Sequence, residues 1–343
     1  MKVLNSYDEF MRLADGMYIC SVVCGWKVCP PHLSELRNTG WAFACRKEGI
    51  LVYYECHMHM FMNGRNYREA VALHRNGVNE EDIRRHLDAY ARAGVTYLRD
   101  GGDNLGVSAR TVPIAPEYGI EYRTPIFAIH KNGHYGGIVG RGFDTMKEYH
   151  DLIKEAAAAG ADFIKIMVSG ILDFTRGGAL TEESLDREEI REMVHIAHEE
   201  GFAVMVHTNG ADAVRAVIDA GIDSIEHGNF MDEECLQALC GSRCIWVPTF
   251  VTITNLIGSG RYDDESLTRL KREQGERIRK GFALGASIAP GSDAGAFRVP
   301  HAQGIQDEYR ELYALCADQM TREEFDRKIE RAAEELKLRF TRK

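Results

Sequence analysis

The chain lacks several features that would place it in other classes of protein. No apolar run approaches the roughly 20 residues that a bilayer-spanning helix needs, and residues 1–20 lack the basic and apolar segments of a signal peptide. Blocks of Lys or Arg are also absent, and the formal net charge is −10, which argues against nucleic acids and anionic membranes as partners. These absences predict a cytoplasmic protein whose partner is a small-molecule substrate.

The cysteine pattern does not suit a disulfide framework. The nine cysteines are an odd number spread along the chain, which is typical of a reducing compartment. Cys20, Cys24 and Cys29 do not have the spacing of a common zinc or iron–sulfur site. We therefore expect ordinary reduced thiols at these positions.

From residue 50 onward the chain repeats one order of elements: a short apolar or β-branched run, an amphipathic helix, then glycine. The predicted strands are Ile50–Cys56, Val95–Asp100, Glu121–Ala128, Phe163–Val168, Ala203–His207, Ser224–His227, Ile245–Phe250 and Ser287–Pro290. Eight such repeats over about 250 residues predict an α/β protein with a (β/α)8 TIM barrel. The alternative is an open doubly wound sheet, but the first βα turn of this sequence lacks the Gly-x-Gly-x-x-Gly fingerprint of that fold. We assign residues 49–343 to the barrel and residues 1–48 to a short N-terminal cap.

Polar side chains gather where these predicted strands end. Side chains alternate along a strand, so His57 and His59 point the same way, and a TIM barrel carries its chemistry at the carboxyl ends of its strands. The further candidates at strand ends, or within the apolar run of a strand, are Lys165, His207, His227 and Asp293. Histidine and carboxylate are ligands that zinc prefers. The set predicts a metal centre at one rim of the barrel.

Lys165 adds a second element to this prediction. It lies within the apolar run Phe163–Val168, where burial lowers the pKa of an amine and leaves part of it neutral. A neutral amine can capture carbon dioxide as a carbamate, an anionic ligand able to bridge two cations. Two cations about 3.5–4 Å apart can share a hydroxide and polarise a carbonyl, the two tasks of amide hydrolysis.

The order His57-x-His59, Lys165, His207, His227, Asp293 resembles the amidohydrolase superfamily, in its binuclear members with a carbamylated lysine. The segments Gly160–Gly170, Ala220–Gly228 and Pro290–Gly295 are similar to the branch of prolidase-like metallo-dipeptidases and imidazolonepropionases. The resemblance implies two divalent cations, zinc first and iron, manganese or cobalt as alternatives. It places one on His57, His59, the Lys165 carbamate and Asp293, and the other on the carbamate, His207 and His227.

The same resemblance implies roles for other residues. Asp293 would be the general base that takes a proton from the attacking water and returns it to the leaving nitrogen. His134 and Tyr135 fall in a Gly/His-rich loop that implies substrate binding. Arg99, Arg176 and Lys131 could pair with a substrate carboxylate, but the more common role of such residues is that of a surface or structural cation.

Three departures from the family pattern affect these expectations. Glu55 stands where aspartate is more common, and Asn209 replaces a second histidine often seen in the dipeptidases, which weakens the case for dipeptides. The chain ends in a predicted helix around Leu336, so the small β-sandwich of the family should be reduced or absent.

Three functions remain open at this level. The first is hydrolysis of an amide-type C–N bond in a dipeptide or N-acyl amino acid. The second is a cyclic amidase or ring deaminase of the same superfamily, and the third is a non-catalytic barrel that serves as a binding protein. Retention of all six metal-ligand positions argues against the third. The sequence is compatible with a homo-oligomer but does not establish one.

Overall fold

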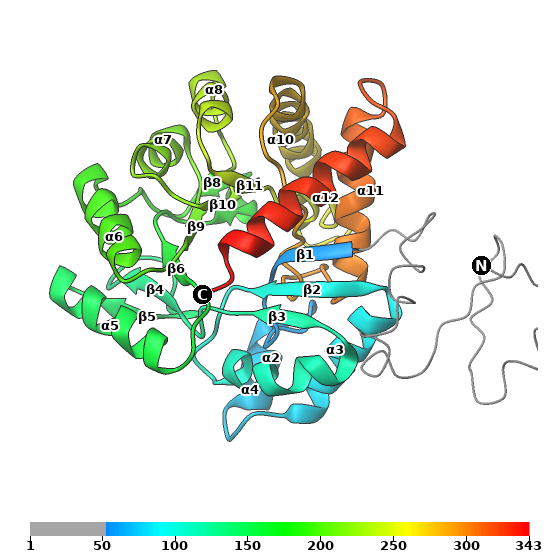
Figure 1. The fold of residues 1–343 in the computed structure, drawn as a ribbon. Coiled ribbons are helices and arrows are strands. Elements are labelled where there is room, and N and C mark those ends of the chain that lie inside the picture. Colours follow the sequence, from blue (N-terminus) through cyan, green and yellow to red (C-terminus); the bar gives the residue numbers. More distant parts are fainter. Residues whose placement is uncertain (1–52, 343) are drawn as a thin grey trace, which may run out of the picture. The chain divides into compact units, whose positions relative to one another are not determined.

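The computed structural model describes residues 53–342. The predicted N-terminal cap of residues 1–48, with Cys20, Cys24 and Cys29, lies outside the described residues. Within them the fold is a mixed α/β, TIM-barrel-like arrangement, with strands around a common centre and helices outside them (Figure 1). The helices are α2 (Tyr67–His74), α3 (Glu80–Arg92), α4 (Val107–Ile114), α5 (Met146–Ala158), α6 (Arg187–Glu199), α7 (Ala211–Asp219), α8 (Glu233–Gly241), α9 (Val251–Thr254), α10 (Asp264–Leu284), α11 (Gln303–Cys316) and α12 (Arg322–Arg339), with 3-10 turns η1 (Ala115–Tyr118) and η2 (Phe174–Arg176).

The principal strands form two parallel sheets. The first has the order β1 (Tyr53–Met58), β2 (Val95–Asp100), β3 (Glu121–Arg123). The second has the order β11 (Ile245–Val247), β10 (Ser224–His227), β9 (Val204–Thr208), β6 (Ile164–Met167), β4 (Ala128–Lys131), β5 (Gly140–Phe143). A short antiparallel pair, β7 (Leu172–Asp173) and β8 (Ala179–Leu180), lies apart from both. Every pairing in the two larger sheets is parallel, as the strand–helix alternation predicts.

The predicted eighth strand, Ser287–Pro290, does not form a regular strand. Its Ile288 makes only an isolated bridge to Trp246. The segment nevertheless spans the gap between the two sheets, because Trp246 N donates to Ser287 O at 2.9 Å and Cys56 N donates to Pro290 O at 3.0 Å. The strands therefore surround one centre without forming a continuous closed sheet.

The predicted strand Glu121–Ala128 is wrong, because the structure divides it into β3 and the start of β4. Pro125 has no N–H to donate to a neighbouring strand, and the next residue, Ile126, has φ 68°, outside the range of extended backbone. The break sends the chain from the first sheet to the second. It also lets β4 reach Lys131, beyond the predicted end.

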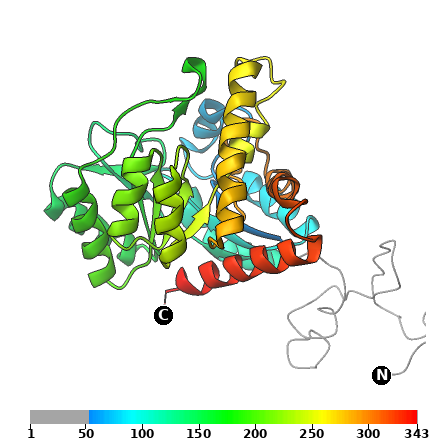
Figure 2. The ribbon, with the colours of Figure 1, turned by 90° about the horizontal axis from the view of Figure 1, so that it is seen from above.

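Helix boundaries follow the local sequence. Thr145 and Glu148 form a reciprocal capping box at the start of α5, which pairs backbone donors that the helix leaves free. Asp263 accepts from Ser266 N at the start of α10, and Gly285 ends that helix at φ 88°. Seen from above, the helices lie on the outer side of the strands (Figure 2).

The last helix, α12, covers the amino ends of the strands. Its buried side chains Ala332, Ala333, Leu336 and Phe340, the last from the residue after the helix, share one cluster with residues from the starts of several strands, such as Tyr54, Phe163 and Ile245. The described chain thus ends in this helix, and residues 53–342 contain no β-sandwich beside the barrel-like domain. The opposite, carboxyl ends of the strands remain for the functional site.

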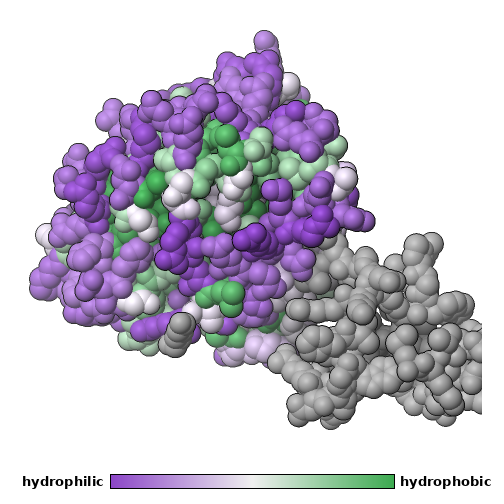
Figure 3. Space-filling model, turned by 45° about the horizontal axis from the view of Figure 1, so that its top comes forward, coloured by the Kyte–Doolittle hydropathy of each residue, from purple (hydrophilic) through white to green (hydrophobic). Residues whose placement is uncertain are grey.

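Hydrophilic side chains cover most of the face drawn in Figure 3, with hydrophobic ones gathered over its middle. No helix within residues 53–342 has the length and apolar character needed to cross a membrane. The five cysteines in this range, Cys56, Cys235, Cys240, Cys244 and Cys316, are free.

The contribution of α12 can be measured with two leucines on the same helix. Leu336 is fully buried whereas Leu338 is 75 % exposed. We expect Leu336→Ala to lower the free energy of unfolding by about 2–5 kcal/mol because it leaves a cavity under the strands, and Leu338→Ala to change it by less than about 0.5 kcal/mol. Urea titration of both variants tests this. Equal losses would show that α12 does not close the core.

Candidate active site

All six predicted metal-ligand residues line one cavity of about 260 Å³. His57 and His59 come from the end of β1 and the residue beyond it, Lys165 from β6, His207 from β9 and His227 from β10. Asp293 follows the irregular segment that bridges the sheets. Six residues separated by as many as 236 positions therefore meet at the carboxyl ends of the strands.

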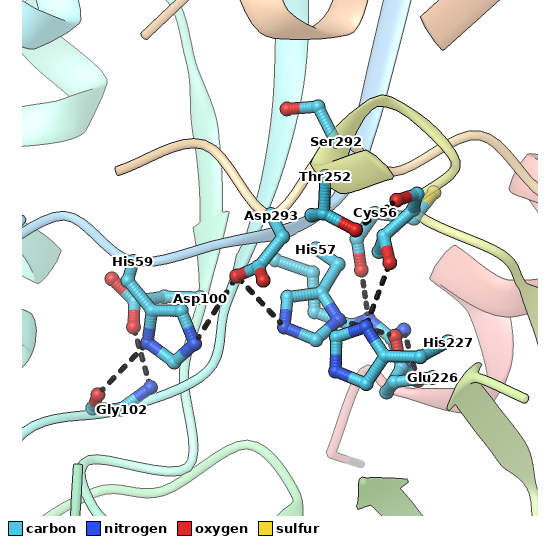
Figure 4. A network of polar contacts seen from close by, with 12 residues as sticks. Cys56, His57, His59, Asp100, Gly102, Glu226, His227, Thr252, Ser292 and Asp293 are labelled. Carbon is cyan, nitrogen blue, oxygen red and sulfur yellow. Dashed lines mark hydrogen bonds and ion pairs between the residues drawn. The ribbon is translucent and has the colours of Figure 1, made fainter. Parts of the chain in front are cut away.

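His57, His59 and Asp293 form the tightest group of the six. Oδ1 of Asp293 lies 3.6 Å from Nε2 of His57 and 3.6 Å from Nε2 of His59, and Figure 4 shows the carboxylate between the two rings. These distances are too long for good hydrogen bonds, so three donor atoms converge without satisfying one another. Their mutual separation, within 4.8 Å, and their chemistry fit a single divalent cation.

A buried carboxylate fixes the orientation of His57. Oε2 of Glu226 lies 2.8 Å from His57 Nδ1, and Oε1 of Glu226 accepts from Arg99 Nη2 at 2.8 Å and from Ser224 Oγ at 2.6 Å. A carboxylate on Nδ1 keeps the proton there and leaves the lone pair of Nε2 facing Asp293. His59 is placed in a similar way, with Nδ1 at 3.4 Å from Gly102 O.

Of the remaining two histidines, His227 contacts a threonine and His207 packs beside His227. Nδ1 of His227 lies 2.7 Å from Thr249 Oγ1, and the ring centroids of His207 and His227 are 4.6 Å apart. His227, Thr249 and Asp293 all have positive φ, at 64°, 47° and 57°. This backbone conformation costs a non-glycine residue about 1–3 kcal/mol and is concentrated here beside the predicted ligands.

Lys165 is a buried amine without a polar partner. Its side chain is 1 % exposed, and no hydrogen bond or ion pair joins Nζ to another residue within 53–342. Burial lowers the pKa of this amine to about 8 because a low dielectric disfavours the ammonium. An unpaired amine of this kind can become a metal ligand once it carries a negatively charged group.

Burial also sets the protonation of the other groups. It lowers the pKa of His59 and of His207 to about 3, and it depresses the pKa of His57 and His227 well below the usual value, so all four imidazoles are neutral at pH 7. Neutral imidazole is the form that binds a cation. Burial raises the pKa of Asp293 to about 7 in the absence of a cation, with Lys165 acting in the opposite direction.

Glu55, one of the departures from the family pattern, lies behind the ligands. Its oxygens accept from Ser292 N at 2.8 Å and Ser292 Oγ at 2.5 Å, and from His57 N at 3.2 Å. Burial raises its pKa to about 8. The residue therefore links the backbone next to Asp293 with the backbone of His57 and does not face the cavity.

The two predicted substrate residues differ in position. Tyr135 lines the cavity, with its ring centroid 5.1 Å from that of His207. His134 does not line it; Nδ1 of His134 lies 3.7 Å from Glu182 Oε1. A role of His134 in substrate binding stays a prediction that this geometry does not favour.

The three cations considered for a substrate carboxylate pair with carboxylates of this chain, as their structural alternative predicts. Arg99 is fully buried beneath the cavity and pairs with Glu226. Lys131 Nζ pairs with Glu189 at 2.8 Å, and Arg176 Nε pairs with Asp173 at 2.7 Å. None of the three lines the cavity.

Sequence reasoning missed the apolar wall of the cavity. This wall comes mostly from segments outside the main strands and comprises Ile138, Ile171, Leu172, Phe174, Tyr262 and Phe297. Ile138 and Ile171 are 42 % and 36 % exposed, and both face this cavity. No periodic pattern marks them, because loop residues follow neither helical nor strand spacing.

The chain resembles known proteins in sequence over part of its length. An ochratoxinase of Aspergillus niger is 28% identical over 163 residues, which are 43% of this chain and 33% of that protein. An uncharacterized protein of Mycobacterium tuberculosis is 28% identical over 132 residues, 37% of this chain and 35% of its own length. The matched part of the chain thus spans about a third of the curated relatives.

Solved structures extend the likeness of fold. A Xaa-Pro dipeptidase with bound methionine superimposes with a TM-score of 0.66 at 21% identity, covering 84% of this chain and 75% of that one. The model of the Amidohydrolase family matches residues 53–321, more than half of the chain and all of the residues around the cavity described above. The protein therefore belongs to the amidohydrolase family.

Proposed function

We propose that the protein is a metal-dependent hydrolase that cleaves an amide-type C–N bond in a dipeptide or an N-acyl amino acid. The observation that carries the proposal is the convergence of four neutral histidines, one unpaired lysine and one aspartate on a single cavity. Membership of the amidohydrolase family and the fold shared with a Xaa-Pro dipeptidase support the reaction class.

The residues suit two divalent cations, zinc being the first candidate. His57, His59 and Asp293 would hold one, His207 and His227 the other, and Lys165 as its carbamate would join the two. Bound there, the cations would activate water and polarise the scissile carbonyl.

Proton transfer, orientation of the ligands and exclusion of water would depend on side chains of this chain. Asp293 would accept a proton from the attacking water and deliver it to the leaving nitrogen; its carboxylate, which faces the cavity between two histidines, supports this role. Glu226 keeps the proton of His57 on Nδ1. The apolar wall excludes bulk water and offers space for a hydrophobic side chain of the substrate.

The proposal is tested by amino-acid release from a library of dipeptides and N-acyl amino acids, using protein produced with zinc and bicarbonate. We expect a cluster of hydrolysed substrates that share an apolar group, because the cavity wall is apolar, and loss of their hydrolysis after treatment with a chelator. No release by protein that holds two metals per chain would refute amide cleavage of this class and favour cyclic amides or ring deamination.

Lys165 can be tested separately with Lys165→Met, which keeps the volume of the side chain but removes the amine. We expect metal content to fall below two ions per chain and activity to fall at least about 100-fold, on the order of an essential group. Stability should not fall, because no buried amine remains to be desolvated. The exposed Lys154→Met serves as the control. A Lys165→Met protein with two metals and full activity would exclude the carbamate.

Glu226→Gln tests the orientation of His57. The amide can turn a donor toward His57 Nδ1, which forces the ring proton onto Nε2, and it leaves Arg99 without its counter-charge. We expect metal affinity to fall about 10–100-fold and the free energy of unfolding to fall by about 3–5 kcal/mol.

The matched control for this variant is Glu200→Gln, which removes a carboxylate from a surface pair with His150 at 2.5 Å. It should change stability by less than about 1 kcal/mol and leave metal binding unaltered. Metal titration and urea unfolding of both variants give the comparison. Similar behaviour of the two would mean that Glu226 does not orient His57.

A further inference from the structure

A second cavity, of about 440 Å³, adjoins the candidate active site. The two cavities share five lining residues, Met62, Tyr67, Tyr262, Ala296 and Phe297. The shared residues come from three separate segments: the stretch from the end of β1 to the start of α2, the turn before α10 and the loop after Asp293. A molecule that reaches the six predicted ligands can therefore extend into the second cavity.

The second cavity differs from the first in charge. Its lining includes three guanidinium groups, those of Arg65, Arg68 and Arg261, and no carboxylate. Among residues 53–342, no carboxylate oxygen lies within 4.0 Å of any of the three. The chain as a whole has a formal net charge of −10, so three arginines without a carboxylate partner among the described residues are a local concentration of positive charge.

The carboxylates nearest in sequence have other partners. Glu69 accepts from Asn66 Nδ2 at 3.0 Å. Asp263 accepts from Ser266 N at 2.8 Å at the start of α10, and Asp264 accepts from Gly258 N at 2.9 Å. These acids serve the local backbone and its caps, so the donors of the three arginines stay open to a ligand.

Arg261 is held at the border between the two cavities. Its guanidinium lies 4.6 Å from the ring centroid of Phe297 and 5.2 Å from that of Tyr262, close enough for cation–π attraction. Stacking of this kind positions the guanidinium while leaving its N–H groups free in the plane of the group. Phe297 lies four residues after Asp293, so Arg261 contacts the loop that follows Asp293.

We infer that the second cavity binds an anionic group of the substrate, a carboxylate held by Arg65, Arg68 and Arg261 at a distance from the scissile bond. The inference rests on the proposed function and narrows it to acidic substrates: dipeptides or N-acyl amino acids with an additional carboxylate. Arginine is suited to this role because its planar fork can donate two parallel hydrogen bonds to one carboxylate.

Hydrolysis of matched pairs tests the inference. The pairs are dipeptides that carry Glu or Gln at the same position, first at the amino-terminal and then at the carboxyl-terminal residue, so that each pair differs by one charge. We expect at least one pair to favour the glutamyl member about tenfold in kcat/KM, chiefly through KM, on the order of one charge-assisted contact. The double variant Arg65→Gln/Arg261→Gln should lose this preference, so that kcat/KM falls more for the glutamyl member than for the glutaminyl member.

Arg75→Gln provides the matched control. Arg75 is an exposed arginine at the end of α2 that lines neither cavity, so its loss changes the net charge without touching the proposed site. This variant should retain the preference for the glutamyl member. Equal loss in Arg75→Gln and in the double variant would reduce the effect to general electrostatics and overturn the inference.

Binding of glutarate, compared with binding of the uncharged glutaramide, distinguishes this inference from the proposed function. Saturation-transfer NMR on the full chain should detect glutarate in the wild type and in Arg75→Gln, and a weaker signal in the double variant. Arginine-dependent binding of glutarate without any amide hydrolysis would sustain the anion site and refute the proposed reaction. Amide hydrolysis without a preference for the glutamyl member, together with equal glutarate binding in all variants, would sustain the proposed reaction and refute the anion site.

Discussion

The buried carboxylate of Glu226 is the contact on which the arrangement of the site depends. It lies between Arg99 and His57, and all three side chains are at most 1 % exposed. Arg99 also donates to Cys56 O at 2.6 Å and to Ser224 Oγ at 2.8 Å, so one guanidinium joins β1, β2 and β10. A buried charge is tolerated only when its partners are complete. The strands that carry His57 and His227 therefore have a fixed relation to each other.

The same arginine connects the two ends of the barrel-like domain. Its guanidinium lies 4.5 Å from the ring centroid of Phe340, just after α12, and 5.8 Å from that of Phe163. The aromatic cluster under the strands thus supports, through Arg99 and Glu226, the histidine above them. Because such interiors are closely packed, a change in α12 can alter the position of His57 without touching the cavity.

Much of this arrangement could be predicted because it follows regular spacing. His57 and His59 are two apart at a strand end, and Lys165 is a lone charge in an apolar run, so both stand out against a known pattern. Arg99 also sits in an apolar strand, but a buried arginine that pairs inward and one that meets a substrate look identical in sequence, so the sequence left both roles open. The break at Pro125 and the irregular segment Ser287–Pro290 were not predicted for a similar reason. Tertiary contacts decide whether a short extended run becomes a strand.

The walls of the cavities were beyond prediction because they are built from loops. Tyr262 and Phe297 are 35 positions apart and meet only through the fold, and the arginine between them has no periodic signal. The predicted metal ligands, in contrast, sit on or directly after strands, apart from Asp293, whose backbone is held at positive φ by hydrogen bonds such as Asp293 N to His57 O at 2.7 Å. In the proposed function, chemistry and recognition therefore belong to different parts of the chain: the strands and their ends would hold the reacting groups, and the loops would set charge and shape around them. Loop substitutions would change which substrate enters without disturbing the packing that fixes Glu226, Arg99 and His57, which is why family membership determines the reaction class more firmly than the substrate.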